Sequence, residues 1–252
     1  MDFNILHKAK GVLYLTTEQP EFSNVYVAVR KNEKRIFTDD EISNLPFTCS
    51  RNIHAKEWQL RQKSTARFTK YLKSKQKTQT ILDIGCGNGW FSKEMAIVSK
   101  KNYVIGLDVN TKELEQAARI FKHSNLQFIY GNIFEIDSFL EQFDIITLNG
   151  SVQYFPDFEE LFETLQSFLK PKGEIHIIDS PFYPAHKIAD ARHRTYAYYT
   201  NLGFPEMAKN YHHHEESKII RFKILYQYKQ NIINKVLGRK DSPFPWLRQI
   251  KD

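Results

Sequence analysis

The 252-residue chain suits one large domain, or one domain with additions, because most domains span ~100–200 residues. Hydrophobic residues make up 41% and charged residues 26% of the chain, which excludes a disordered or fibrous protein. No apolar run reaches the ~18–20 residues of a membrane span, and the first residues lack the pattern of a secretory signal. Cys49 and Cys86 indicate free thiols in a reducing compartment. We therefore expect a cytoplasmic globular protein without membrane contact.

The net charge of +7 is unevenly distributed along the chain. Residues 1–77 contain 15 basic and 8 acidic residues, residues 78–180 contain 8 and 15, and residues 181–252 contain 13 and 6. These segments are interpreted as an N-terminal extension, a core domain and a C-terminal segment. The basic ends either neutralise the acidic core or face an anionic substrate or nucleic acid, and the first interpretation is favoured.

In chain order, the first predicted element is an amphipathic helix over residues 54–73, with many basic residues on its outer side. Five short apolar runs follow, and most lack polar alternation, which is typical of strands buried on both faces of a parallel sheet. They are residues 80–85, 103–108, 126–130, 143–149 and 174–179.

Helical patterns separate the later runs. Residues 111–123 follow Asn110, a candidate N-cap, and residues 157–169 begin at Asp157, a second candidate cap. Strands that alternate with helices predict βαβ units and a doubly wound α/β domain. Beyond residue 180, residues 186–202 predict a helix that ends at Gly203, residues 219–228 are ambiguous, and residues 244–250 could form a late strand.

Three glycines follow the first core strand and precede a helix. Gly85, Gly87 and Gly89 permit a tight turn and a close approach of a ligand to the backbone. Their G-x-G-x-G spacing differs from the G-x-G-x-x-G of dinucleotide sites. Asp83 would repel a pyrophosphate but suits a ligand with an ammonium or sulfonium group. Asp108, at the end of the next strand, can accept hydrogen bonds from both ribose hydroxyls.

Residues 78–180 resemble the class I S-adenosylmethionine (SAM)-dependent methyltransferase family. Residues 83–89 (DIGCGNG) are similar to its first motif, 106–110 (GLDVN) to its second, 131–133 to its third and 149–154 (NGSVQY) to its fourth. The resemblance implies a mostly parallel, seven-stranded Rossmann-like sheet with helices on both faces, an N-terminal helical extension, and a C-terminal lid. It implies SAM as cofactor and S-adenosylhomocysteine as product. The implied cofactor-binding residues are Asp83, Gly85, Cys86, Gly87, Asn88, Gly89, Asp108, Val109, Asn132, Ile133, Asn149 and Gly150.

The methyl acceptor leaves a weaker signal in the sequence, because methyl transfer mainly needs alignment of donor and nucleophile. The catalytic residue is unknown, with Tyr154 as the candidate. Candidate substrate residues are Trp58 and Arg61 on the helix before the core, and Arg192 and Tyr196 in the basic, aromatic stretch after it. No metal site is expected, because the adjacent histidines 212–214 point in different directions.

A small-molecule acceptor is the favoured interpretation. An RNA methyltransferase is permitted by the basic ends, although no RNA-binding module accompanies them. A SAM-binding protein without catalysis also remains open, whereas a nicotinamide-dependent oxidoreductase is disfavoured by the glycine spacing and by Asp83. The identity of the acceptor and the oligomeric state are left open.

Overall fold

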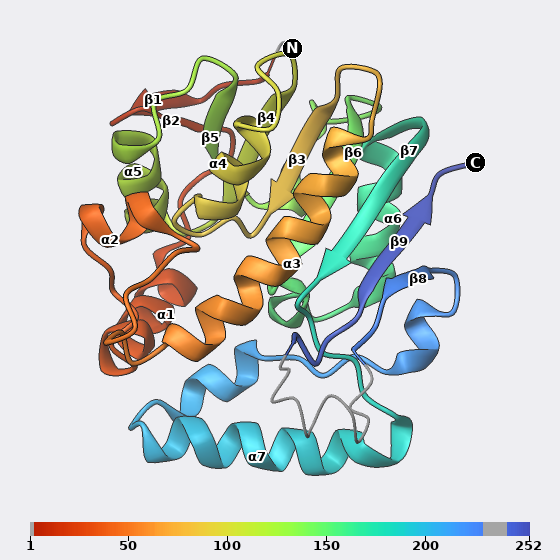
Figure 1. Ribbon diagram of the computed structural model, residues 1–252. Helices are drawn as coiled ribbons and strands as arrows, with labels where there is room; N and C mark the ends of the chain where they lie inside the picture. Colours follow the sequence, from red (N-terminus) through yellow and green to blue (C-terminus); the bar gives the residue numbers. More distant parts are fainter. Residues whose placement is uncertain (1–2, 229–240) are drawn as a thin grey trace.

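The computed structural model describes residues 3–228 and 241–252, which form a nine-stranded sheet in the order β1-β2-β5-β4-β3-β6-β7-β9-β8 (Figure 1). The strands are β1 His7–Ala9, β2 Val12–Tyr14, β3 Thr80–Ile84, β4 Tyr103–Asp108, β5 Leu126–Tyr130, β6 Phe143–Asn149, β7 Leu169–Ile178, β8 Lys223–Tyr226 and β9 Trp246–Ile250. Strands β2, β5, β4, β3, β6 and β7 run parallel, and β1, β8 and β9 add antiparallel pairs at the edges.

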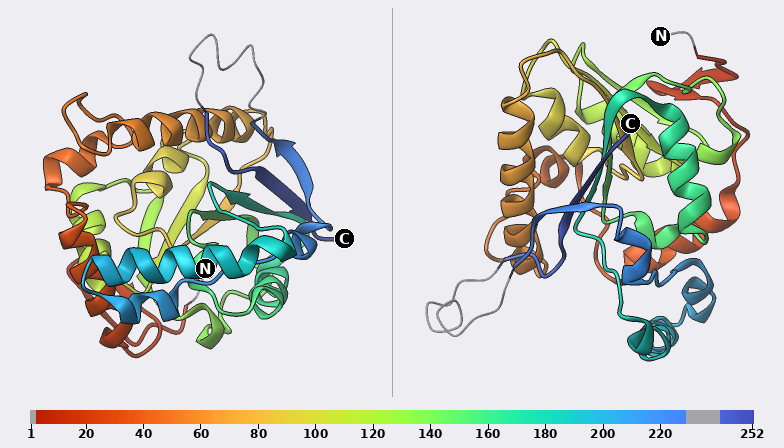
Figure 2. Two further views of the ribbon diagram at one scale, coloured as in Figure 1. Left: turned by 90° about the horizontal axis from the view of Figure 1, so that it is seen from below. Right: turned by 90° about the vertical axis from the view of Figure 1, so that its right-hand side faces the viewer.

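Helices cover both faces of this sheet, as expected. They are α1 Pro20–Asn32, α2 Asp39–Asn44, α3 Ala55–Lys73, α4 Trp90–Ala96, α5 Thr111–Ile120, α6 Phe158–Phe168 and α7 Ile188–Asn201. Helices α3, α4 and α5 bury their apolar sides on one face, and α6 packs on the other. Figure 2 shows α3 and α6 on opposite sides of the sheet. Short 3₁₀ helices connect these elements: η1 Ile133–Glu135, η2 Val152–Tyr154, η3 Ala185–Lys187, η4 Pro205–Asn210 and η5 Glu216–Ile219.

The five core strands and both helix caps predicted from the sequence are confirmed. The side chain of Asn110 accepts a hydrogen bond from the backbone N–H of Glu113, and Asp157 accepts from two N–H groups of the first turn of α6. One boundary differs, because β7 begins directly after α6. Residues 170–173, expected as a turn before the strand, form an irregularity within β7 in which Lys172 has a φ of 64°.

The described sheet has two strands more than the seven expected, because β1 and β2 of the N-terminal extension add to it, while the late strand expected at 244–250 is present as β9. Strand β2 pairs in parallel with β5, so the N-terminal extension is part of the sheet as well as helical. The ambiguous residues 219–228 contain a strand, β8, which pairs with β9. Helix α7 runs across the carboxyl-terminal end of the sheet (Figures 1 and 2), and none of the described helices is both long and apolar enough to cross a membrane.

Candidate cofactor and acceptor site

A cavity of about 1370 Å³ lies at the carboxyl-terminal ends of β3, β4, β5 and β6. Strand β3 has β4 on one side and β6 on the other, so this is the topological switch point where open α/β sheets bind ligands. The opposite walls come from α1, α3 and α7. Since a single small-molecule site is typically ~300–1,000 Å³, the cavity has room for two ligands.

The glycine loop forms the floor of this cavity. Gly85 has a φ of 68°, and a Cβ atom built on it would lie 2.6 Å from Cβ of Ser151. Gly89 is the N-cap of α4 and has a φ of 74°, and a Cβ there would lie 2.5 Å from Cε1 of Phe128. Gly85 therefore brings β3 close to the turn after β6, while Gly89 lets α4 pack directly on β5.

Asp108 fixes the shape of the glycine loop from the end of β4. Its Oδ2 atom accepts a hydrogen bond from the backbone N–H of Gly87 at 2.7 Å, and its Oδ1 atom accepts one from the N–H of Asn110 at 2.8 Å. Burial raises the pKa of Asp108, and these N–H groups partly offset that effect. The carboxylate lines the cavity beside the loop.

Two more carboxyl groups line the same end of the cavity. Asp83 is 1% exposed and accepts hydrogen bonds from the hydroxyls of Ser92 at 2.6 Å and Thr147 at 2.8 Å. Burial raises the pKa of Asp83 to about 7, and burial together with the charge of Asp108 does the same for Glu113. One buried acid and two half-buried acids at one end of a cavity favour a ligand with a positive charge.

Several polar groups around the cavity have no hydrogen-bond partner within the protein. Among the described residues these include both polar side-chain atoms of Asn149, Oδ1 of Asn88 and Oε1 of Gln153. Asn132 is different, because its carbonyl accepts from the N–H of Phe134 at 3.3 Å. Buried polar atoms are nearly always paired in native proteins, so these unpaired atoms indicate the position of a polar ligand.

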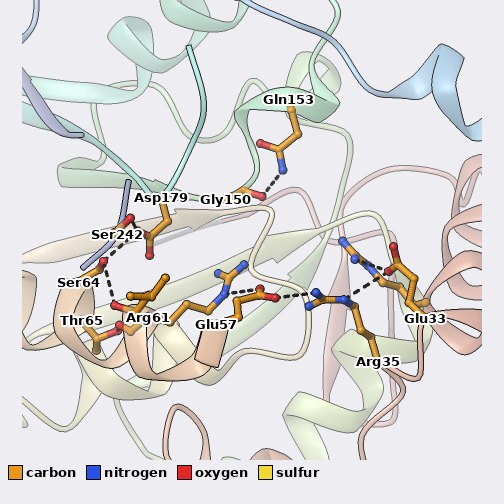
Figure 3. A network of polar contacts seen from close by, with 12 residues as sticks. Glu33, Arg35, Glu57, Arg61, Ser64, Thr65, Gly150, Gln153, Asp179 and Ser242 are labelled. Carbon is orange, nitrogen blue, oxygen red and sulfur yellow. Dashed lines mark hydrogen bonds and ion pairs between the residues drawn. The ribbon is translucent and has the colours of Figure 1, made fainter. Parts of the chain in front are cut away.

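A chain of alternating charges follows the wall built by α1 and α3 (Figure 3). Arg30 contacts Glu33 at 2.8 Å, and Glu33 also lies 3.5 Å from Arg35. Arg35 donates to Glu57 at 2.6 Å, and Glu57 accepts from Nε of Arg61 at 3.0 Å. Three arginines alternate with two glutamates, so the chain carries one uncompensated positive charge.

Arg61 lies at the end of this chain of charges and lines the cavity. Its Nη1 and Nη2 atoms lie about 3.5 Å from a Cβ atom built on Gly150, and no described residue accepts a hydrogen bond from them. The guanidinium lies 5.5 Å from the ring of Trp58. Trp58 is 4% exposed and lines the cavity, and its Nε1–H has no partner either. Two adjacent donors are thus available to an anionic group of a ligand.

The other half of the cavity is aromatic. Its rings come from α1, η2, α7 and the segment after η4: Phe22, Tyr26, Tyr154, Tyr199 and Tyr211. The hydroxyl of Tyr154 accepts a hydrogen bond from Nη2 of Arg30 at 2.9 Å, and its ring packs edge-on against Tyr26 and Tyr211. A hydrogen bond links the C-terminal end of α1 to α7 beside this half of the cavity: the hydroxyl of Tyr198 donates to the carboxylate of Glu33 at 2.5 Å.

Comparison with known proteins identifies the core. A family model described as "Methyltransferase domain" matches residues 75–230. The chain belongs to this methyltransferase family. It is 27% identical over 147 residues to the malonyl-[acyl-carrier protein] O-methyltransferase of Halalkalibacterium halodurans, covering 55% of this chain and 54% of that protein. It is 25% identical over 194 residues to the sterol 24-C-methyltransferase of Debaryomyces hansenii, covering 73% and 49%. The chain thus spans about half the length of these curated relatives.

Solved structures show the same fold. A putative methyltransferase of Haloferax volcanii, solved with the Trm112 methyltransferase activator, matches with a TM-score of 0.58 and 12% identity, covering 93% of this chain and 99% of that one. The YcgJ protein of Bacillus subtilis matches with a TM-score of 0.54 and 18% identity, covering 67% and 73%. The Rossmann-like methyltransferase fold predicted from the motifs is therefore confirmed.

Most of the site residues predicted from the sequence line the large cavity. Eleven of the twelve implied cofactor residues line it: Asp83, Gly85, Cys86, Gly87, Asn88, Asp108, Val109, Asn132, Ile133, Asn149 and Gly150. Gly89 does not, because it faces β5. Tyr154, Trp58 and Arg61 also line the cavity, whereas Arg192 and Tyr196 line a separate hollow on the other side of α7.

Several other residues line the cavity although no motif in the sequence predicts a site role for them. In the sequence, Glu113 could be assigned only to the first turn of a helix, and Gln153 only to the fourth motif. Tyr26 and Arg30 lie on α1, whose sequence carries no motif, so their place depends on how α1 docks. His212, considered in the sequence only as a possible metal ligand, also lines the cavity.

The remaining candidates are structural. Burial and the neighbouring carboxylates raise the pKa of the Cys86 thiol far above its usual range, which keeps it protonated. His176 is fully buried, contacts Glu174 at 3.1 Å and accepts a hydrogen bond from Nε1 of Trp246 at 3.1 Å, so it is a core histidine. Within residues 3–228 and 241–252, no cluster of three or more His, Cys, Asp or Glu side chains is arranged to hold a metal ion.

Proposed function

We propose that the protein is a SAM-dependent methyltransferase that acts on a small-molecule acceptor. One observation carries the proposal: a single cavity at the switch point joins the glycine loop and Asp108 to an aromatic half that has room for a second ligand. Family membership supports the methyl donor. The names of two relatives, which specify malonyl-acyl carrier protein and a sterol, support small acceptor groups.

The cavity residues fit SAM. Asp108 would accept hydrogen bonds from the ribose hydroxyls, and Ile133 and Asn132 would border the adenine. The carboxyl groups of Asp83, Asp108 and Glu113 suit the positive charges of the ammonium and sulfonium groups. Arg61 and the indole N–H of Trp58 would hold the methionine carboxylate, which would also compensate the excess charge of the arginine chain.

The bound cofactor would supply an electrophilic methyl group, and the protein has to align the acceptor with it and exclude water. The hydroxyl of Tyr154, which accepts from Arg30, keeps its own proton free to donate to the acceptor. Burial and nearby His214 and Arg192 lower the pKa of His212, so its imidazole is neutral at neutral pH and one ring nitrogen is free to accept a proton. Tyr154 would thus orient the acceptor, and His212 would remove its proton.

Calorimetric titration tests the cofactor assignment. SAM and S-adenosylhomocysteine should bind with a stoichiometry of one per chain, whereas NAD should not, because the carboxyl groups beside the glycine loop would repel a pyrophosphate. Saturable NAD binding without a response to either adenosyl ligand would contradict the proposed cofactor.

Turnover separates an enzyme from a binding protein without catalysis. The protein is incubated with SAM carrying a deuterated methyl group and with a small-metabolite extract, and products are followed by mass spectrometry. A labelled product that forms with the parent protein, and at least tenfold more slowly with Tyr154→Phe, is the expected result. Adenosyl-ligand binding without any labelled product in small-molecule or RNA fractions would favour the non-catalytic alternative.

A further inference from the structure

A second hollow, of about 360 Å³, lies between α7 and the segment around η4. It shares Pro156, Lys209, Tyr211 and His212 with the large cavity, so the two spaces adjoin. No acidic side chain occurs among the described residues that line it. This hollow therefore extends the acceptor half of the site into a basic region.

The basic groups of the hollow lack partners, unlike the arginines of α1 and α3. Among the described residues, no carboxylate pairs with Arg192 or Lys209, and no group hydrogen-bonds the imidazole of His212. His213 is 8% exposed, and its Nε2 atom lies 2.9 Å from the hydroxyl of Thr195. Burial, the charge of Arg192 and the adjacent histidines lower the pKa of His213 to about 4. The hollow is thus lined by two exposed cationic side chains, Arg192 and Lys209, that form no ion pair among the described residues.

The donor set matches an anion with several oxygen atoms. Arg192 offers a planar fork, Lys209 a point charge, His212 a ring N–H in one of its tautomers, and Tyr196 a hydroxyl. A phosphate monoester carries ~1.5–2 negative charges and three strong acceptor oxygens, so it has an acceptor for several of the donors that line this hollow. A carboxylate has one charge and two oxygens and would leave part of the set unused.

We infer that this hollow binds the phosphate group of a phosphorylated small-molecule acceptor, whose methyl-accepting atom reaches into the large cavity. The inference rests on the proposed function, because the two spaces make one site only if the aromatic half receives the acceptor. Four shared wall residues connect the phosphate end with the end where the methyl group is transferred. The hollow would therefore select acceptors by an anionic group remote from the reacting atom.

Inorganic phosphate is the probe that tests the inference, titrated calorimetrically at low ionic strength into the parent protein, Arg192→Gln and Lys209→Gln. Each variant should bind phosphate on the order of tenfold more weakly, as expected for loss of a charge-assisted hydrogen bond. Arg51→Gln is the matched control, since Arg51 is exposed, has no ion pair within the described residues and lies outside both spaces. It should bind phosphate like the parent.

Phosphate affinity that is the same in the parent and in both hollow variants would overturn the inference, as would acetate binding as tight as phosphate binding. A short RNA that binds the parent more tightly than phosphate and depends on Arg192 would also overturn it, because the hollow would then serve a nucleic acid. S-adenosylhomocysteine is titrated in parallel. Retained adenosyl binding with failed phosphate binding refutes only this inference, whereas lost adenosyl binding in the parent refutes the proposed function.

Discussion

Arg61 is the end of the chain of charges along α1 and α3, which contains one more arginine than glutamate. Its free donors can therefore be used to test which ligand group binds there. Its guanidinium shares Glu57 with Arg35, and its two Nη atoms face the cavity without an acceptor in the described structure. The Arg61 side chain is half-buried, so a ligand anion beside it is screened less by water than the partner of a fully exposed cation would be. Two adenosyl ligands, one with and one without the amino-acid carboxylate, test whether that carboxylate is the anion.

Arg61→Gln should weaken the binding of S-adenosylhomocysteine on the order of tenfold or more, because one charge-assisted contact to its carboxylate is lost. The affinity of 5′-methylthioadenosine, which lacks the amino-acid part, should be unchanged. Calorimetry on both ligands gives the comparison, with Arg51→Gln as the control for removal of a positive charge. If both ligands weaken equally, Arg61 supports the fold of the site and does not contact the carboxylate.

The raised pKa of Asp83 leads to a second prediction, on how the free energy of unfolding depends on pH. Its pKa is about 7 in the folded chain against an ordinary value of 3.8, so between these values the folded state holds a proton that the unfolded chain has released. The free energy of unfolding should therefore fall as the pH rises from about 4 to about 7, by up to ~1.4 kcal/mol per pH unit from this group.

Asp83→Asn removes this titration and keeps a polar group of similar size. Urea unfolding at pH 5 and pH 8 should show a smaller loss of stability for the variant than for the parent. Some slope should remain, because burial also raises the pKa of Asp108 and Glu113. An equal slope in both proteins would show that Asp83 does not take up the proton.

At the scale of elements, the packing of α4 on β5 depends on the absence of a side chain at Gly89. Gly89→Ala combines a left-handed backbone with a clash against Phe128, and Gly203→Ala is its matched control, with a φ of 85° but no atom within 4 Å of the added Cβ. Strain alone should cost Gly203→Ala about 1 kcal/mol of unfolding free energy. Gly89→Ala should lose about 1–3 kcal/mol more by overpacking. Equal losses in denaturant unfolding would show that the helix and strand can separate freely.

Elements with a regular apolar pattern could be predicted, and those decided by tertiary contacts could not. Strands β3 to β6 are buried on both faces and were visible as apolar runs, whereas β1, β2 and β8 have only three or four residues each and form through pairing with neighbours. The cofactor half of the site follows strand ends, so its residues could be assigned from motifs. The acceptor half depends on the docking of α1 and α7, which no local pattern specifies.

Arg192 and Tyr196 illustrate that limit. The sequence indicated a basic, aromatic helix after the core but not which of its sides would face the cavity. Arg194 and Tyr198 line the large cavity, while Arg192 and Tyr196 lie on the other side of α7. Residues two apart on a helix point ~200° apart, so about half a turn of rotation about the helix axis would exchange the two pairs. Only the docked helix shows which pair faces the acceptor half.

At the scale of the whole molecule, the basic ends do compensate the acidic core. Lys10 pairs with Glu115, Lys75 and Arg248 approach Glu174, and Arg221 pairs with Glu159. Each ion pair joins a terminal segment to the central one. This arrangement supports the favoured interpretation of the charge pattern and argues against a continuous surface for a polyanion.

Filter binding of bulk tRNA at 50 and 200 mM salt checks this interpretation. A protein that neutralises six or more phosphates should lose about 10³ or more in affinity between those concentrations. We expect weak binding at both, because many of the basic side chains are already engaged with carboxylates. Submicromolar binding with a steep salt dependence would contradict the small-molecule proposal and favour an RNA acceptor.

The position of β9 has a consequence for how the chain can fold during synthesis. Strand β8 pairs in the sheet only through β9, which inserts between it and β7. Trp246 of β9 also supplies the hydrogen bond that the buried ring of His176 accepts. Until Ile250 has left the ribosome, β7 therefore has an open edge, β8 has no partner strand, and a core histidine lacks one of its bonds. The nascent chain would need to remain protected from edge-to-edge association during that interval.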